Sequence, residues 1–119
     1  MNRIARRTLI AAALGAALAP AALAHHGWGS YDSNTVLTLN GTIRAATYEN
    51  PHGTLQFDAD GKTWLVILAP PSRMQNRGLE AAALKPGTVA TVVGYPSRND
   101  PLEMRAERIT VDGKTTELR

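Results

Sequence analysis

The fold is decided by the stretch TLQFDADGKTWLVIL, residues 54–68. Residues 54–57 alternate apolar and polar side chains, which is typical of a half-buried strand. The following Asp58-Ala59-Asp60-Gly61-Lys62 is a short hairpin turn of the Asp/Gly type. Residues 63–68 form the return strand, with Trp64, Val66 and Leu68 on one side. The stretch therefore predicts a β-hairpin at the centre of a β-rich domain.

The flanking segments extend this pattern on both sides. Before the hairpin, residues 36–43 alternate like a strand, with a bulge or sharp coil expected at Gly41. A turn-rich loop at residues 48–53 follows. After the hairpin, residues 70–77 are compatible with a helix that Gly78 ends, and residues 79–84 form a second short helical turn. Residues 88–95, 104–111 and 115–118 are then three further strands.

The order strand, strand, strand, helix, strand, strand is that of an OB-fold. We therefore expect a mainly β protein: a small five-stranded OB-like barrel with one short helix between its third and fourth strands. Another small antiparallel barrel or roll is the alternative. The expected core residues alternate as a closed sheet requires; they are Leu37, Leu39, Ile43, Leu55, Phe57, Trp64, Val66, Leu68, Leu79, Leu84, Val89, Val92, Ile109 and Val111.

The first 24 residues have the anatomy of a secretory signal peptide. Arg3, Arg6 and Arg7 form the basic region, residues 9–18 are apolar, and residues 22–24 read Ala-Leu-Ala, a cleavage pattern. We expect a periplasmic or secreted protein, exported by the general rather than the twin-arginine route and without a membrane anchor after cleavage. The expected organisation is a signal peptide (1–24), an arm (25–36) and a barrel domain (37–119).

Removal of the signal peptide changes the charge balance. The chain has 13 Lys and Arg against 10 Asp and Glu, a net charge of +3. Without the three arginines of the signal peptide, ten basic residues stand against ten acidic ones. Nucleic-acid binding requires clustered positive charge on the folded domain, so we expect no nucleic-acid partner. The sequence contains no cysteine, so no disulfide is available.

Several motifs together resemble a known group of proteins. They are HHGW at residues 25–28, YENPHG at 48–53, LAPPSRM at 68–74, LKPG at 84–87 and VGYP at 93–96. In combination they resemble an uncharacterised family of small exported bacterial proteins, catalogued as a domain of unknown function. The resemblance implies a single exported domain. It implies no activity, and it directs attention to the histidines.

The histidines favour a metal site. Cleavage after Ala24 makes His25 the first residue, and its free amine and imidazole can together chelate a transition metal. Imidazole suits copper, zinc and nickel, and we favour copper. His52 would complete a three-nitrogen site like a copper histidine brace, with His26 as a further ligand. Glu49 would bind the metal or orient the imidazole of His52, and Met74 and Met104 are soft ligands for Cu(I) if they approach the site.

A binding module without metal is the alternative. The sequence contains no recognisable nucleophile elbow, phosphate loop or catalytic carboxylate pair, so we do not expect an enzyme. An OB-type module would bind a small ligand or a periplasmic protein partner through its inter-strand loops. Its pocket would be lined by Trp28, Tyr48 and Tyr95. The arginines 73, 77, 98, 105 and 108 would either face an anionic ligand or form a solvated polar surface.

Overall fold

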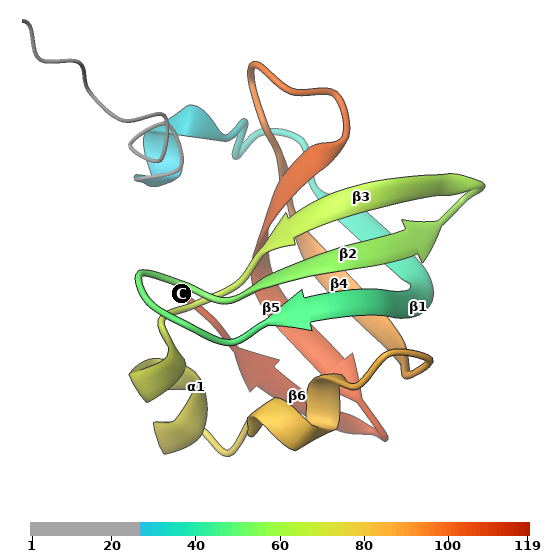
Figure 1. The fold of residues 1–119 in the computed structure, drawn as a ribbon. Helices are drawn as coiled ribbons and strands as arrows, with labels where there is room; N and C mark the ends of the chain where they lie inside the picture. Colours follow the sequence, from blue (N-terminus) through green and yellow to red (C-terminus); the bar gives the residue numbers. More distant parts are fainter. Residues whose placement is uncertain (1–26) are drawn as a thin grey trace, which may run out of the picture.

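A computed structural model describes residues 27–119, and these residues form one closed β-barrel (Figure 1). A 3-10 turn, η2 (Trp28–Ser30), precedes the first strand, and a second one, η3 (Ala81–Leu84), follows the helix. The remaining elements are β1 (Leu37–Thr47), β2 (Thr54–Ala59), β3 (Lys62–Ile67), α1 (Pro71–Asn76), β4 (Val89–Pro96), β5 (Glu103–Val111) and β6 (Lys114–Glu117).

The strand order confirms the OB-like barrel. The strands lie in the order β3-β2-β1-β4-β5-β6, and an additional pairing of β3 with β5 closes the first five into a barrel. The β3–β5 pairing is parallel, with Leu65 opposite Glu103, whereas the other pairings are antiparallel. A five-stranded barrel with its helix between the third and fourth strands is the OB arrangement. β6 adds a sixth strand beside β5.

Two hairpins turn where the sequence predicts them. Asp60 and Gly61 connect β2 to β3, and both have positive φ, at 54° and 75°. Asp112 and Gly113 connect β5 to β6 with nearly the same angles, 51° and 75°. Two successive residues in the left-handed region are the requirement of a type I′ turn, whose twist matches that of the strands. The Asp-Gly pairs thus set the register of both hairpins.

Gly41 serves another purpose than the one predicted. The irregular step of the β1–β2 ladder lies between Ile43 and Ala45, not at Gly41. Gly41 is required because β2 crosses it closely: a Cβ atom here would lie 2.1 Å from the carbonyl oxygen of Asp58. The sequence pattern showed that a glycine was needed, but the reason is the contact between two strands.

The barrel interior holds most of the predicted core. Twelve of the fourteen expected residues are buried in one cluster, whereas Leu37 is only partly buried at its margin. Val89 is the wrong prediction, because its side chain is 71% exposed at the start of β4. Met74 and Met104 are completely buried. Both methionines thus contribute packing to the core.

α1 closes one end of the barrel and holds the last strand in place. It has six residues, and Arg73 within it and Arg77 directly after it extend toward carbonyls at the end of β6 and beyond it. The guanidinium of Arg73 donates to the carbonyl of Leu118 at 3.0 Å, and Arg77 donates to the carbonyl of Glu117 at 2.7 Å. Within residues 27–119 no helix is long and apolar enough to cross a membrane.

Candidate functional site

A row of paired residues runs across the outer face of the barrel. Thr54 of β2 pairs with Ile67 of β3, Ile67 pairs with Arg105 of β5, and Arg105 pairs with Tyr95 of β4. Side chains of directly paired residues lie on the same face of a sheet. Their neighbours Val66, Met104 and Ala106 point inward. The row therefore faces outward, yet Ile67 in its middle is completely buried.

The N-terminal arm lies on this outer face. Two guanidinium groups stack on the ring of Trp28, with Cζ of Arg105 and Cζ of Arg119 each 4.4 Å from its centroid. The ring of Tyr95 meets it edge-on, at 6.1 Å between centroids and 76° between planes. Stacking of cations on an indole within about 6 Å is favourable. We call Trp28, Tyr95, Arg105 and Arg119 the tryptophan clasp.

The arm is also tied to the end of β4 and the loop that follows it. Tyr31 forms an isolated bridge with Ser97, and the amide of Asp32 donates to the carbonyl of Pro96 at 2.9 Å. Arg98 donates from its backbone amide to Ser30 and from Nε to the carbonyl of Gly29. The arm is therefore held from Gly29 to Asp32, just before β1 begins.

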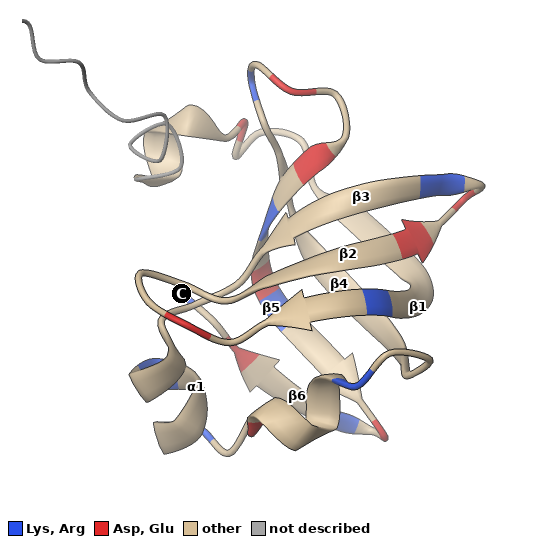
Figure 2. Ribbon diagram, viewed as in Figure 1, with Lys and Arg blue, Asp and Glu red and all other residues tan. Residues whose placement is uncertain are grey.

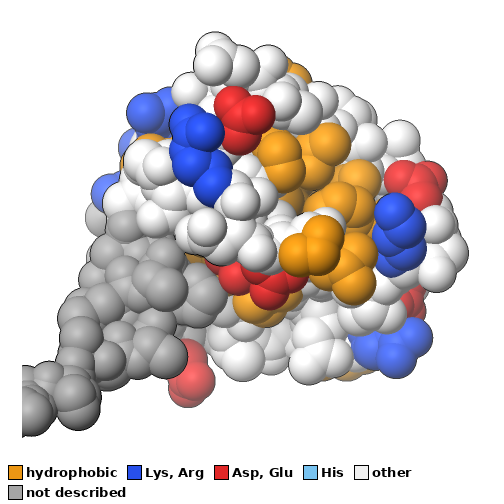
Figure 3. Space-filling view, turned by 90° about the horizontal axis from the view of Figure 1, so that it is seen from above, with side chains coloured by type: hydrophobic (Ala, Val, Ile, Leu, Met, Phe, Trp, Pro, Cys, Tyr) orange, Lys and Arg blue, Asp and Glu red, His pale blue; other side chains and the backbone are white. Residues whose placement is uncertain are grey.

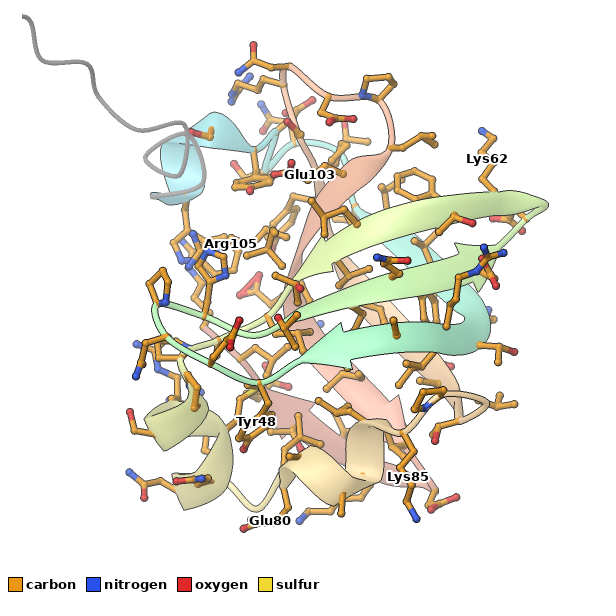
Figure 4. All side chains as sticks on the ribbon, viewed as in Figure 1. Tyr48, Lys62, Glu80, Lys85, Glu103 and Arg105 are labelled. Carbon is orange, nitrogen blue, oxygen red and sulfur yellow. The ribbon has the colours of Figure 1, made fainter. Side chains whose placement is uncertain are left out.

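A buried hydrogen bond fixes the arm to β5. The hydroxyl of Tyr31 donates to the Glu103 carboxylate at 2.5 Å, and both side chains are buried. Burial, then the bond to Glu103, raises the pKa of Tyr31 well above its usual value. Burial also lowers the pKa of the neighbouring Arg105, and the positive charges of Arg73 and Arg119 lower it further. Figure 4 shows Glu103 and Arg105 on the side of the barrel that the arm approaches.

The loop that carries His52 joins β1 to β2. His52 is half-buried, and its Nδ1 atom has no contact with solvent. The next residue, Gly53, extends the β2–β3 ladder: its amide donates to Ala69 and its carbonyl accepts from the amide of Leu68, both at 2.9 Å. A Cβ atom on Gly53 would lie 2.9 Å from the methyl group of Met74 and 2.9 Å from the carbonyl oxygen of Thr47. His52 therefore precedes a tightly packed position.

The structure describes only some of the predicted metal ligands, and these lie in different surroundings. His25 and His26 lie outside the described residues. Glu49 is exposed in the same loop as His52. Met74 packs beneath Gly53, next to His52 in the sequence, whereas Met104 lies in the barrel core. Between residues 27 and 119 no three His, Asp or Glu side chains are grouped closely enough to hold a metal ion.

The three aromatic residues predicted to line a pocket lie at two places. Trp28 and Tyr95 meet in the clasp. Tyr48 packs against the core, and its hydroxyl donates at 2.5 Å to the carbonyl of Leu79, between α1 and η3. Figure 4 shows Tyr48 at the end of the barrel that α1 and η3 cover.

The clasp contains its own charge network. The Tyr95 hydroxyl donates a short hydrogen bond to the Glu107 carboxylate, which raises the pKa of Tyr95 above its ordinary value. Glu107 also lies 3.8 Å from the guanidinium of Arg119. Sequence reasoning did not identify Arg119 or Ile67, whereas it did expect the rings of Trp28 and Tyr31 to hold the arm against the barrel. Arg105 appeared only among the surface arginines, because nothing in the local pattern connects it to Trp28.

A polar hollow of about 370 Å³ lies where β2 turns into β3, at the end of β2 away from the His52 loop. Its charges are largely satisfied within the protein: Arg44 binds Asp58 at 3.0 Å, and Thr63 donates to Asp58 at 2.7 Å. The hydrogen bond from Thr63 is the larger cause, and the one from Arg44 the next, of a lowered pKa of Asp58. Figure 2 shows basic and acidic residues of β1, β2 and β3 together at this end. The hollow is lined by Asn40, Arg44, Asp58, Ala59, Asp60, Gly61, Lys62 and Thr63.

Comparison with known proteins confirms the resemblance that the motifs indicated. No curated protein matches the sequence. The model of a family of unknown function, DUF6152, matches residues 13–104. This range includes the arm, the His52 loop, α1 and β4. Since the match spans well over half of the chain, the protein belongs to DUF6152, a family of unknown function.

Proposed function

We propose that the exported protein, after removal of residues 1–24, binds a transition metal through the amine and imidazole of His25 together with His52. Copper is the favoured metal. The observation that carries the proposal is the contact between Trp28 and Arg105, whose guanidinium carbon lies 4.4 Å from the indole centroid. It anchors the chain three residues after His25, on the face where β2 begins after the loop of His52.

The distances between these positions are short enough for the two histidines to meet. Arg105 and Thr54 lie two strand spacings apart in one ladder row, which is about 10 Å. His52 lies two residues before Thr54, or at most about 7 Å farther along the chain. The three residues from Trp28 back to His25 span at most about 11 Å. The arm therefore does not have to cross the length of the barrel to bring His25 to His52.

The chemistry of the ligands favours copper binding at neutral pH. Two imidazoles and an amine offer three nitrogen donors, and such donors rank Cu²⁺ highest among the divalent metals of the first transition series. Each of these nitrogens must be unprotonated to bind, so acidification weakens the site. Glu49 is exposed in the loop of His52 and is available as an oxygen donor. The protein then holds and delivers or stores the metal rather than turning over a substrate.

Copper titration of matched proteins tests the proposal. Mass spectrometry first establishes that the exported protein begins at His25. Protein with that terminus, and protein extended by Met-Gly-Ser-Gly before His25 (the Met-extended protein), are then titrated with Cu²⁺ against a competing chelator. The longer extension keeps every histidine out of the second and third positions, where a histidine would form a separate copper chelate with the new terminus. We expect the extension to weaken binding at least tenfold, because it converts the His25 amine into an amide. His52→Gln should also weaken binding at least tenfold, whereas the matched variant His26→Gln should weaken it less, because His26 is a further ligand without the amine that makes His25 a chelate.

Two results would overturn the metal proposal. One is a mature terminus at a residue other than His25. The other is equal copper affinity for the native and the Met-extended protein. Repeating the titration at lower pH adds a check. The native protein should lose affinity faster than the extended one, because the terminal amine is a metal ligand, and can be protonated, only in the native site.

Binding of a ligand or protein partner without metal is a second candidate, and the exposed apolar side chains favour it. Val36 is 62% exposed before β1, and Leu102 is 40% exposed in the β4–β5 loop. Figure 3 shows apolar side chains gathered on one face of the molecule. This function predicts that copper uptake equals that of a variant without histidines. It also predicts that 8-anilinonaphthalene-1-sulfonate fluoresces with the wild type and loses most of that signal with Leu102→Ser.

A further inference from the structure

The geometry points to Arg119 as a positioning residue of the proposed metal site, one that touches no metal and acts by holding Trp28. This inference rests on the proposed function. Arg119 stacks on the same indole as Arg105, and each guanidinium carbon lies 4.4 Å from the ring centroid. The ring is thus held by two cations. The last residue of the sequence thereby contacts the arm that leads to His25.

The position of Arg119 is itself fixed from two sides. Its backbone carbonyl accepts a 3.0 Å hydrogen bond from Arg77, the residue after α1, and the preceding carbonyl of Leu118 accepts one from Arg73 of α1. Its guanidinium lies 3.8 Å from the carboxylate of Glu107. A side chain held by its backbone and by an acid loses little further freedom when it stacks on a ring. Arg119 can therefore restrain the arm at low entropic cost.

α1 supports both halves of the proposed site. Through its own Arg73, and through Arg77 directly after it, the helix holds the segment that ends in Arg119, and Arg119 contacts Trp28. Through Met74 it packs against Gly53, the neighbour of His52. The arm and the loop thus rest on one short helix. Loss of the Arg119 contact should loosen the arm at Trp28 while leaving the His52 loop in place.

Arg119 is a better test position than Arg105. Arg105 sits within the ladder between Ile67 and Tyr95, and its replacement would disturb the barrel. The side chain of Arg119 is 52% exposed and follows the last strand. Its removal takes away one of the two cations that stack on Trp28. A cation on an indole is worth about 0.5–1 kcal/mol at an exposed site, so the arm should be held about two- to fivefold less tightly.

The experiment compares Arg119→Met with Arg119→Lys and with Arg108→Met. Lys keeps a cation for the indole, whereas Met keeps only the length and the apolar stem. Arg108 is the matched control, because it is also an exposed arginine that binds an acid, Glu117 at 2.8 Å, and it is absent from the clasp. Both Met variants remove one positive charge. Loss of positive charge alone should strengthen the binding of a metal cation, so weaker binding in Arg119→Met would have another cause.

Two measurements are made on each protein with its native terminus. Fluorine NMR of 5-fluorotryptophan reports the surroundings of Trp28 without any metal, with the signal assigned by Trp28→Phe. Competition titration gives the copper affinity. We expect Arg119→Met to move the Trp28 resonance and to weaken copper binding two- to fivefold. Arg119→Lys should retain most of the affinity, Arg108→Met should lose none, and the Met-extended protein should respond to none of the three.

The outcomes separate this inference from the proposed function. Strong copper binding by the native protein together with unchanged affinity in Arg119→Met would overturn the inference alone. An equal loss in Arg119→Met and in the Met-extended form of that variant would do the same, because the effect would not pass through the His25 amine. Failure of the native protein to bind copper better than its Met-extended form would overturn the proposed function, and this inference with it.

Discussion

The hydroxyl of Tyr31 donates a 2.5 Å hydrogen bond to the carboxylate of Glu103, 72 residues farther along the chain. Tyr31 is 1% exposed and Glu103 is 6% exposed, so the bond is shielded from water. It joins the arm to the first residue of β5, two residues before Arg105. The arm is thus held by a buried polar contact as well as by the tryptophan clasp.

Replacement of Tyr31 by Phe should destabilise the protein at neutral pH. The phenyl ring fills the same space, but Glu103 loses a donor where water does not reach it. Loss of a hydrogen bond to a buried charged group costs about 1–3 kcal/mol. Urea unfolding should show this decrease in the free energy of unfolding. Tyr48→Phe is the comparison, because its hydroxyl donates to a neutral carbonyl and its loss should cost less.

The same tyrosine should make the protein sensitive to alkali. Tyr31 has its pKa raised from the ordinary value of 10.0, chiefly by burial, so the folded protein keeps the proton that the unfolded chain releases. Its contribution to stability is complete below pH 10 and is lost progressively as the pH rises above it, by up to about 1.4 kcal/mol per pH unit. Unfolding temperatures between pH 8 and pH 11.5 should fall more steeply for the wild type than for Tyr31→Phe. Parallel curves for the two proteins would show that Tyr31 ionises normally when folded.

The fold was predictable because its determinants are local. The Asp60-Gly61 and Asp112-Gly113 pairs specify their turns by conformation, whatever surrounds them. Alternation along each strand then specifies which side chains enter the barrel. The exception, Val89, shows the limit of this reasoning. It lies three positions before the buried Val92, so it stands on the opposite, outer face of β4 with Thr91 and Val93, and an apolar residue type alone did not show that.

Val89 and Val92 should therefore tolerate the same substitution very differently. Val89→Thr places a hydroxyl in solvent and should change the free energy of unfolding by less than about 0.5 kcal/mol. Val92→Thr buries the hydroxyl in the barrel core, where the side chain of Val92 is completely covered, and should cost about 1–3 kcal/mol. Urea unfolding of the two variants provides the comparison. Similar losses would mean that Val89 is buried in solution.

The candidate site was only partly predictable. Trp28, Tyr48 and Tyr95 were expected to line one pocket; Trp28 meets Tyr95, whereas Tyr48 lies at another place, against Leu79. The two arginines that stack on Trp28 lie 77 and 91 positions after it in the sequence, and only the closure of the barrel brings them there. Arginines on polar strands resemble any solvated surface. Ile67 likewise alternates out of the core pattern, and no local signal shows that the outer face is covered there.

Gly53 should be the least replaceable residue of the His52 loop. A Cβ atom here would lie 2.9 Å from the methyl of Met74, which can move, and equally close to the carbonyl of Thr47, which belongs to the backbone of β1. We expect Gly53→Ala to lower the free energy of unfolding by about 1–3 kcal/mol. Gly29→Ala is the control, because nothing lies within 4 Å of its Cβ position. Equal stability of the two variants in urea would show that the loop is less tightly packed than the contacts indicate.

Ile67 offers a test of whether the arm covers the outer face of the barrel. It is completely buried, although it lies outside the core cluster and pairs with Arg105, on which Trp28 stacks. If the arm shields Ile67, Ile67→Ala and Trp28→Ala remove parts of one packed layer, and their effects on the free energy of unfolding should not add. Residues in contact typically couple by about 0.5–3 kcal/mol in a double-mutant cycle. The pair Ile43→Val and Trp28→Ala should instead be additive, because Ile43 lies within the barrel core. Additivity in both cycles would show that residues other than those of the arm shield Ile67. The tryptophan clasp would then be an isolated surface contact.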